Sequence, residues 1–281
     1  MTWFSFLLAH GVRPFPARYF AHRIDRMYFD QGRPRQRAGI IRGDEDYYCP
    51  VPGVVYRSRL SDLVVLCDEQ WKGAVIDRIC SIFDMILVDE GQDFAGYDFN
   101  ILLSLMNASE RMIIVGDPRQ QTYRTNAGLA NSGFRDVFEF FAKNSSCQID
   151  TTSLCTTHRC PADIICLANQ LYPRLPEVLP SAGVSQGTIT ILTQKEFPSW
   201  AKSHDERLTV LRYSARSKTP AGYPTMNMGE SKGLTLGNVA IFPTGDMRKW
   251  VKDHQIALKD ETRAKLYVAI TRTSRDLAFV L

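Results

Sequence analysis

Short apolar runs recur along the chain, each bounded by polar residues or glycine, a pattern typical of strands buried on both faces. These runs predict strands over Asp84–Asp89, Arg111–Asp117, Thr188–Leu192, Leu208–Tyr213, Asn238–Pro243 and Leu277–Leu281. Between them, helical spacing of apolar residues predicts helices over Ala17–Tyr28, Ser61–Ile82, Tyr97–Met106, Phe134–Lys143, Ala162–Leu171 and Glu261–Thr271. This alternation predicts an α/β fold with parallel sheets flanked by helices, which bind ligands at the carboxyl ends of strands.

The length of the chain allows two domains. A single core usually stops growing near about 250–300 residues, and this chain has 281. The polar stretch Asn144–Gln148 follows a predicted helix and precedes the next apolar pattern. We therefore expect domains over residues 1–150 and 151–281.

Composition narrows the class of protein. The chain is 44% hydrophobic and 23% charged, the balance of a folded globular protein. Its apolar opening is far shorter than the roughly 20 residues that cross a bilayer, so no membrane partner is expected. The seven cysteines are irregularly spaced, which predicts reduced thiols in a cytoplasmic protein.

Positive charge is concentrated near the start of the chain. Residues 1–43 contain eight arginines and only two acidic residues, Asp25 and Asp30. The arginines are Arg13, Arg18, Arg23, Arg26, Arg33, Arg35, Arg37 and Arg42. Such a region attracts a phosphate backbone, although charge alone fits a solvated helix face at least as well.

The segment Ile86–Phe94 (ILVDEGQDF) carries the strongest chemical signal. A carboxylate held rigidly at the end of a buried strand, here Asp89, can orient magnesium, while a neighbour such as Glu90 can polarise an attacking water. A strand followed by Asp-Glu occurs often by chance. Gln92 and Asp93 make chance a much weaker explanation.

Four further segments follow in order. After the next strand, Gly116-Asp117 leads into a polar loop that would place the Gln120 amide at a terminal phosphate. Arg159 precedes a predicted helix, and Arg272 ends another; a guanidinium binds phosphate oxygens with a planar fork. Between them, the glycine turn with Lys232 could hold phosphates, but it precedes a strand and is not a Walker loop. Taken singly, each feature also fits a turn, cap or surface residue.

Together and in this order, the five segments resemble the motifs of UvrD/Rep-type superfamily-one DNA helicases. The opening Thr2–Phe6 (TWFSF) is similar to that family's DNA-contacting Thr-Phe-His-Ser-Phe segment. The resemblance implies two RecA-like lobes that bind ATP and magnesium. The implied catalytic residues are Asp89 (also the magnesium ligand), Glu90, Gln120, Arg159 and Arg272. Further implied nucleotide contacts are His158, Lys232 and Gly233, and implied DNA contacts are Thr2, Ser5, Phe6, Tyr123 and Lys232.

The chain departs from the family pattern at several positions. His158 stands where the family often has an adenine-stacking tyrosine, and Thr125-Asn126 replaces an aromatic-arginine pair. Thr235 stands where the family usually has a glutamate, and a glutamate there would imply contact with the ribose. The stretch between Tyr172 and Thr225 is too short for the accessory insertion of the longer helicases. Base stacking at Thr125, ribose contact and strand separation by an insertion are therefore not supported.

No Gly-Lys-Thr or Gly-Lys-Ser occurs in the sequence. By the resemblance, the glycine-rich phosphate loop and first strand would lie before Met1, so we expect an N-terminally incomplete first lobe. A sheet without that strand leaves an apolar edge open, which predicts poor solubility or a partner. That partner would be a separate or upstream segment supplying the phosphate loop.

The predicted function is an ATP-dependent DNA helicase or translocase, a truncated form impaired in hydrolysis on its own, that acts on single-stranded or partly duplex DNA. DNA repair and phage defence are family-level expectations. The alternative is a non-enzymatic DNA-binding or regulatory module that retains the fold. A third possibility is a protein-interaction remnant with no nucleic-acid role.

Overall fold

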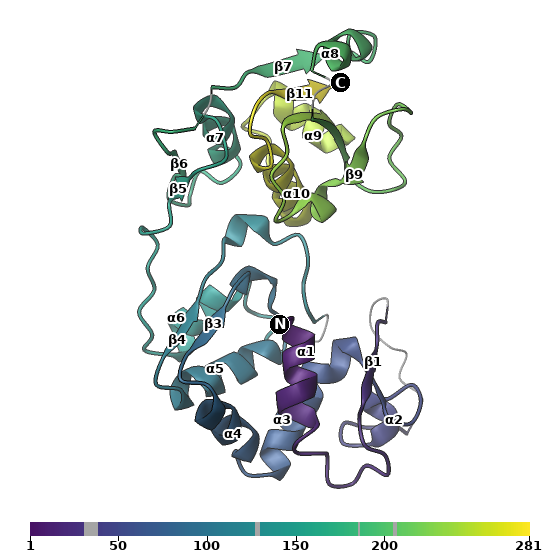
Figure 1. The fold of residues 1–281 in the computed structure, drawn as a ribbon, viewed down its shortest axis with the longest axis vertical. Helices are drawn as coiled ribbons and strands as arrows, with labels where there is room; N and C mark the ends of the chain where they lie inside the picture. Colours follow the sequence, from purple (N-terminus) through teal and green to yellow (C-terminus); the bar gives the residue numbers. More distant parts are fainter. Residues whose placement is uncertain (31–38, 127–129, 185, 205–206) are drawn as a thin grey trace. The chain divides into compact units, whose positions relative to one another are not determined.

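The computed structural model describes residues 1–30, 39–126, 130–184, 186–204 and 207–281. Contacts divide the chain into two compact units (Figure 1). The first contains residues 1–117 and 124–148, and the second contains 118–123 and 149–281. The chain therefore passes between the units three times.

The first unit is mainly helical. Its helices are α1 (Trp3–Phe6), the π-helix η1 (Leu7–Val12), α2 (Glu45–Tyr48), the 3₁₀ turn η2 (Arg57–Arg59), α3 (Leu60–Gln70), α4 (Ala74–Ile82), the 3₁₀ turn η3 (Gly91–Asp93), α5 (Asp98–Ala108) and α6 (Val137–Asn144). The core of the unit lies where η1 packs on α3 and α4 (Figure 1). A Cβ added to Gly11 would lie 2.6 Å from the Val64 side chain, so glycine allows η1 to approach α3 this closely.

Two small parallel sheets complete the first unit. β1 (Arg26–Tyr28) pairs with β2 (Val54–Tyr56), and β3 (Ile86–Val88) pairs with β4 (Met112–Ile114). Leu87 and Ile113 are register partners on β3 and β4, and they are 69% and 51% exposed. One apolar face of this sheet therefore lies open among the described residues.

The second unit is built on a five-stranded parallel sheet with strand order β7-β11-β10-β8-β9. Its strands are β7 (Ile189–Leu192), β8 (Leu208–Arg212), β9 (Thr225–Asn227), β10 (Asn238–Phe242) and β11 (Leu277–Val280). A separate parallel pair joins β5 (Thr156–Thr157) to β6 (Leu179–Pro180). The remaining elements are the 3₁₀ turns η4 (Pro118–Gln120) and η5 (Met228–Ser231) and the helices α7 (Ala162–Asn169), α8 (Phe197–Ser203), α9 (Gly245–Lys252) and α10 (Asp260–Thr271).

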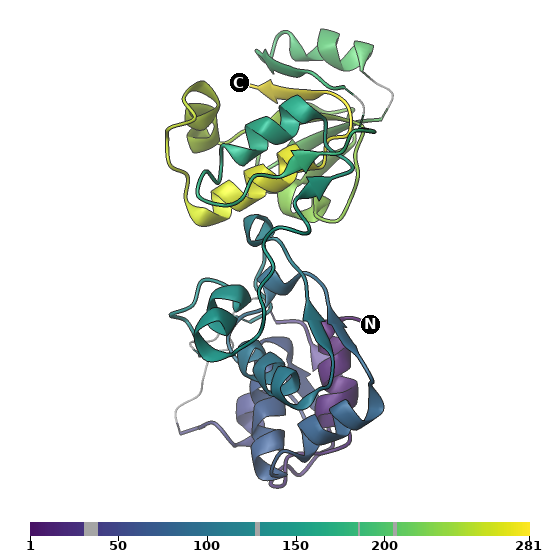
Figure 2. The same ribbon diagram turned by 90° about the vertical axis from the view of Figure 1, so that its left-hand side faces the viewer.

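Helices cover both faces of this sheet. Val239 and Ile241 of β10 point into a core shared with α7, α9 and α10. Ala240 and Phe242, on the opposite face, pack with α8. Figure 2 shows α7 and α10 side by side over their face. Alternate residues of one strand thus fill two cores, which explains its continuous apolar sequence.

All six predicted strands are present, as shorter strands within the predicted ranges, and the α/β class with parallel sheets flanked by helices is confirmed. The predicted helix over Ala17–Tyr28 is wrong, because Arg26–Tyr28 instead forms β1 and pairs with β2. The predicted helix over Ser61–Ile82 is interrupted between α3 and α4. Lys72 and Gly73 have φ of 56° and 88° there, which no right-handed helix accommodates.

All seven cysteines are free thiols, as predicted. Within the part of the chain that the structure describes, none of the helices combines the length and apolarity needed to span a membrane.

Candidate functional site

The acidic pair lies at the carboxyl end of β3 in the first unit. Asp89 is exposed, and its Oδ1 accepts a hydrogen bond from the Glu90 backbone N at 2.7 Å. Glu90 has φ 56° and ψ 39°. This is the left-handed region of the backbone, which residues other than glycine, asparagine and aspartate seldom adopt. Such backbone persists only where its surroundings enforce it, and it concentrates at functional sites.

Gln92 is the residue that fixes the Glu90 side chain. It is fully buried, its Nε2 donates to Glu90 Oε2, and its Oε1 accepts from the Asp117 backbone N at 2.9 Å. A Cβ on Gly116 would lie 2.3 Å from Gln92 Oε1, so a side chain at 116 would displace the amide. Gln92 thereby ties the carboxylate after β3 to the backbone after β4.

A fully buried carboxylate, Asp98, joins separate segments of the first unit. It accepts hydrogen bonds from Trp3 Nε1 at 2.7 Å, from the hydroxyls of Ser61 and Thr125, and from the Ala95 backbone N at 3.4 Å. Burial raises the pKa of Asp98, although these donors stabilise the charged form. The start of the chain, α3 and the segment after Tyr123 are thus joined through one side chain.

The predicted nucleic-acid contacts at the start of the chain are engaged within the fold. Thr2 caps α1: its hydroxyl donates to Ser5 Oγ at 2.8 Å and accepts from the Ser5 backbone N at 3.3 Å. Phe6 stacks on Trp3 with ring centroids 5.6 Å apart, which keeps it partly buried. Tyr123 is 42% exposed, so its ring is accessible at the surface of the second unit.

The loop that carries Gln120 packs in the second unit together with α10. Gln120 Oε1 accepts a hydrogen bond from an Arg272 terminal nitrogen at 3.3 Å. Arg272 is the C-cap residue that follows α10, and it is only 3% exposed. The structure therefore brings together two predicted phosphate-binding residues that stand 152 positions apart.

Arg159 joins the same group of residues through Thr235. Its Nε donates to Thr235 Oγ1 at 2.8 Å, and the neighbouring Leu236 N donates to the Arg272 carbonyl at 2.8 Å. Burial raises the pKa of the Cys160 thiol to about 12, while the charges of Arg159 and Arg272 act in the opposite direction. Both arginines thus act on one buried thiol. We call Gln120, Arg159, Thr235 and Arg272 the arginine cluster.

The remaining predicted nucleotide contacts lie nearby in sequence. Lys232 is half-buried at the end of η5, and Gly233 has φ 80°, the conformation that favours glycine in a turn. His158 is exposed beside Arg159. Asp89 and Glu90 belong to the first unit, whereas Gln120, Arg159 and Arg272 belong to the second.

The candidate residues of the two units lie at opposite ends of their strands. Asp89 follows β3 at its carboxyl end, as expected for an α/β fold. Thr235 and Arg272 instead precede β10 and β11, at the amino ends of these strands. The expectation of ligands at carboxyl ends therefore does not describe the candidate residues of the second unit.

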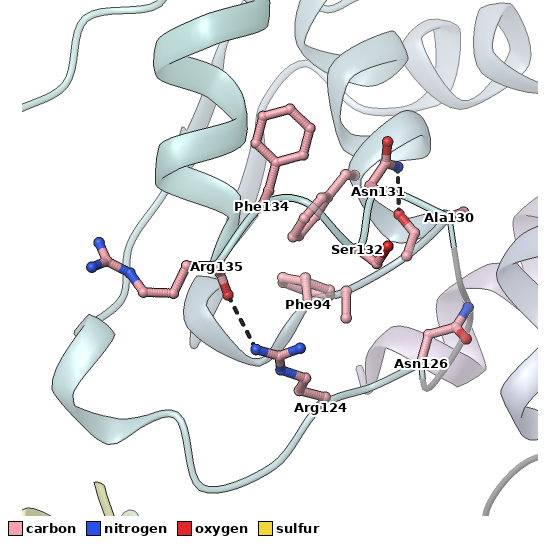
Figure 3. Close-up of a pocket in the computed structure, with 11 residues that line it drawn as sticks. Phe94, Arg124, Asn126, Ala130, Asn131, Ser132, Phe134 and Arg135 are labelled. Atoms are coloured by element: carbon pink, nitrogen blue, oxygen red, sulfur yellow. Dashed lines mark hydrogen bonds between the residues drawn. The ribbon is translucent and has the colours of Figure 1, made fainter. Parts of the chain in front are cut away.

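The structure also contains a cavity of about 270 Å³ in the first unit. Phe94 and Phe134 contribute aromatic rings to its lining, and Arg124 turns toward the Arg135 carbonyl, to which it donates at 3.5 Å (Figure 3). Asn131 closes another side by donating to the Gly96 carbonyl at 2.8 Å. This cavity was not predicted, because its lining comes from separate segments.

The basic region near the start of the chain is partly neutralised within the fold. Arg42 pairs with Asp62 at 2.7 Å and Glu69 at 3.4 Å. Arg18 lies over the Trp71 ring at 4.7 Å. Arg33, Arg35 and Arg37 lie outside the described residues. Some arginines of this region therefore make ion pairs and ring contacts within the fold, in addition to contributing to the surface potential.

Sequence reasoning missed three of the residues that organise the candidate site. Gln92 was noted only as part of a motif, although its position two residues after Glu90 puts its amide within reach of that carboxylate. From the sequence, Thr235 is only a departure from the family pattern, yet its hydroxyl accepts a hydrogen bond from Arg159. Asp98 was not predicted, because its side-chain donors Trp3, Ser61 and Thr125 come from three other segments of the chain.

One comparison with known proteins shows a family. A family model described as the viral superfamily 1 RNA helicase core domain matches residues 64–281. No curated protein sequence matches the chain.

Three solved structures illustrate the similarities in fold. Arterivirus nonstructural protein 10, a helicase in complex with DNA, is 18% identical over 70% of this chain and 39% of that chain, with a TM-score of 0.42. A crystal structure of arterivirus nonstructural protein 10 is 19% identical over 69% and 38%, with a TM-score of 0.43. The C-terminal domain of a possible DNA helicase from Lactobacillus is 10% identical over 44% and 86%, with a TM-score of 0.30. The chain thus spans about two fifths of the arterivirus chains.

Proposed function

The chain belongs to the viral superfamily 1 RNA helicase core family, and from this premise we propose that it is the core of an ATP-dependent helicase that moves along single-stranded nucleic acid. The observation that carries the proposal is the arginine cluster of the second unit. There the Arg272 guanidinium donates to the Gln120 amide, and Arg159 donates to Thr235, whose neighbour Leu236 donates to the Arg272 carbonyl. Such a group suits a triphosphate, because guanidinium groups bind phosphate oxygens bidentately and keep their charge.

The first unit would supply the acidic half of the chemistry. Asp89 fits one ligand position of a magnesium ion, which binds through one or two carboxylates together with water and substrate phosphates. Among the described residues, no group of three or more His, Cys, Asp or Glu side chains is placed to hold a metal. When bound, magnesium neutralises charge on the phosphates. Glu90, held by Gln92, would orient and polarise the attacking water.

For the nucleic acid we propose DNA, on the resemblance of the motifs to UvrD/Rep-type helicases. Thr2, Ser5, Phe6, Tyr123 and Lys232 are the proposed contacts. Tyr123 is the strongest of them, because its accessible ring can stack on a base without regard to sequence.

The test is nucleic-acid-stimulated ATP hydrolysis with single-stranded DNA and RNA of equal length. We expect little turnover from this chain alone, because its sequence contains no phosphate loop. A longer form that carries Gly-Lys-Thr or Gly-Lys-Ser should regain stimulated turnover, with a larger effect from DNA. In that form, Glu90→Gln should abolish hydrolysis, while Glu110→Gln, the same change at an exposed glutamate before β4, should leave it intact.

The competing function is a non-enzymatic nucleic-acid-binding module. It predicts salt-sensitive single-strand binding that neither ATP nor Glu90→Ala alters. Stimulated hydrolysis near that of an intact helicase by this chain alone would contradict the proposed impairment. Equal activity of the Glu90→Gln variant would contradict the helicase proposal itself.

A further inference from the structure

The six-residue loop Pro118–Tyr123 is separated from its sequence neighbours on both sides. Residues 117 and 124 belong to the first unit, whereas the loop packs within the second. It opens with the 3₁₀ turn η4, and the Thr122 backbone N donates to the Gln120 carbonyl at 2.8 Å. Thr122 also lies near η5, since a Cβ added to Gly229 would be 3.9 Å from the Thr122 Cβ.

Arg119 makes the contacts that hold this loop. It is only 8% exposed, and a terminal nitrogen donates to the Pro176 carbonyl. Its guanidinium lies over the Tyr267 ring, 5.9 Å from the centroid. The Arg119 carbonyl accepts from the Tyr172 hydroxyl at 3.1 Å. Side chain and backbone of this residue are thus held separately.

The two tyrosines form a rigid support. Tyr172 and Tyr267 pack edge to face with centroids 5.6 Å apart, a favourable aromatic geometry. Tyr267 is 2% exposed and lies on α10, the helix that ends at Arg272. One helix therefore carries both the surface on which Arg119 rests and the guanidinium that contacts Gln120.

This arrangement fixes the orientation of the Gln120 side chain. Gln120 directly follows Arg119, so immobilising the Arg119 backbone limits where the Gln120 amide can lie. Its Oε1 accepts from Arg272 at 3.3 Å.

We propose that Arg119 is a positioning residue: by holding the loop on Tyr172 and Tyr267, it keeps Gln120 beside Arg272 as one preassembled receptor for a terminal phosphoryl group, carried entirely by the second unit. The proposal rests on the proposed ATP-dependent function. Arg119 itself does not contact the nucleotide. It acts by removing the cost of ordering Gln120 when a triphosphate binds.

The test compares binding of a fluorescent non-hydrolysable ATP analogue and the matching ADP analogue to the full chain with magnesium. Wild type should prefer the triphosphate, and Arg119→Ala should lower this preference about tenfold, the scale of one charge-assisted hydrogen bond. Affinity for the diphosphate should not change. Arg119→Lys should restore part of the preference, because the ammonium group keeps the charge and can donate hydrogen bonds, although it lacks the planar fork of the guanidinium.

Hydrogen exchange supplies a second measurement on the same variants. Arg119→Ala should raise exchange at the Thr122 amide without altering α3 or α4. The matched control is Arg59→Ala in the first unit. Arg59 is also 8% exposed, lies over the Tyr47 ring at 4.0 Å and donates to a backbone carbonyl. Its loss should lower stability but leave triphosphate preference unchanged.

The outcomes separate the two claims. Faster exchange at Thr122 with unchanged triphosphate preference would overturn the positioning role. Unchanged exchange would overturn the anchoring itself. If the wild-type chain does not prefer the triphosphate analogue, that result contradicts the proposed function, and the inference about Arg119 is overturned with it.

Discussion

The sheets of the two units differ in how completely their strands are covered. Every residue of β10 and β11 in the second unit is buried, and helices lie on both faces. In the first unit, Leu87 of β3 and its partner Ile113 of β4 are 69% and 51% exposed. The same kind of apolar run therefore forms a central strand in one unit and a half-covered strand in the other.

The difference shows where each unit obtains its stability. The second unit relies on a sheet filled from both sides. The first relies on helices, with Leu7, Leu63, Ile79 and Leu105 all at 0% exposure in its main core. The sheet of the first unit contributes mainly by presenting Asp89 and Glu90 at its end.

The largest expected effect follows from truncating one aliphatic residue in each sheet. Ile241→Ala in β10 should cost about 2–5 kcal/mol, because Ile241 is fully buried and leaves a cavity. Leu87→Ala in β3 should change stability by no more than about 0.5 kcal/mol. Urea denaturation, followed by tryptophan fluorescence in variants that keep only Trp250 in the second unit or only Trp71 in the first, measures both. Similar losses would show that the sheets are equally covered.

The buried carboxylates of the first unit should respond to acid in the opposite direction to Glu261 of the second unit. Burial raises the pKa of Asp62, Asp68 and Asp98 in the first unit, so the folded state binds more protons than the unfolded chain. Their contribution to stability therefore falls as pH rises from the ordinary carboxyl value of about 4 through their raised pKa, by up to about 1.4 kcal/mol per pH unit for each proton. In the second unit, the Lys265 ammonium lowers the pKa of Glu261, whose contribution is instead lost as pH falls.

Asp98→Asn isolates the part of this response that comes from Asp98. It should reduce the pH dependence of first-unit unfolding and leave that of the second unit unchanged. Urea denaturation between pH 4 and pH 7 provides the measurement. A slope that survives the substitution in full would assign the response to Asp62 and Asp68 alone.

Substitutions on the open face of the β3–β4 sheet should have the smallest effect on stability but a measurable effect on solubility. Replacing Leu87 by Lys and Ile113 by Glu puts opposite charges on register partners, which should change unfolding free energy by less than about 1 kcal/mol. Light scattering should show less association, because exposed apolar sheet surface promotes it. Ile82→Lys changes an exposed apolar residue on a helix of the same unit and serves as control. An equal gain from that control would remove any special role for the sheet.

The sequence predicted these six strands well because each is a short apolar run that can be recognised locally, without knowing which strand it pairs with. It predicted Ala17–Tyr28 wrongly because pairing of β1 with β2 depends on residues 54–56, far along the chain. The break between α3 and α4 could have been predicted from Gly73. The motifs identified Arg159, Gln120 and Arg272, but not their connection through Thr235, which arises only when segments 76 residues apart meet.

The position of the Gln120 loop could not be predicted from the sequence either. Both flanking segments belong to the first unit, and only contacts such as Arg119 with Pro176, 57 residues apart, draw the loop into the second.

The threefold passage of the chain between its units has a consequence for dissecting the protein. Proteolytic cleavage after residue 148 would not release the second unit whole, because the released C-terminal piece would lack residues 118–123. In that piece the Tyr172 hydroxyl would lose the carbonyl to which it donates, and Arg272 would lose Gln120. A fragment of residues 149–281 would therefore lack part of the second unit itself, in addition to being separated from the first unit.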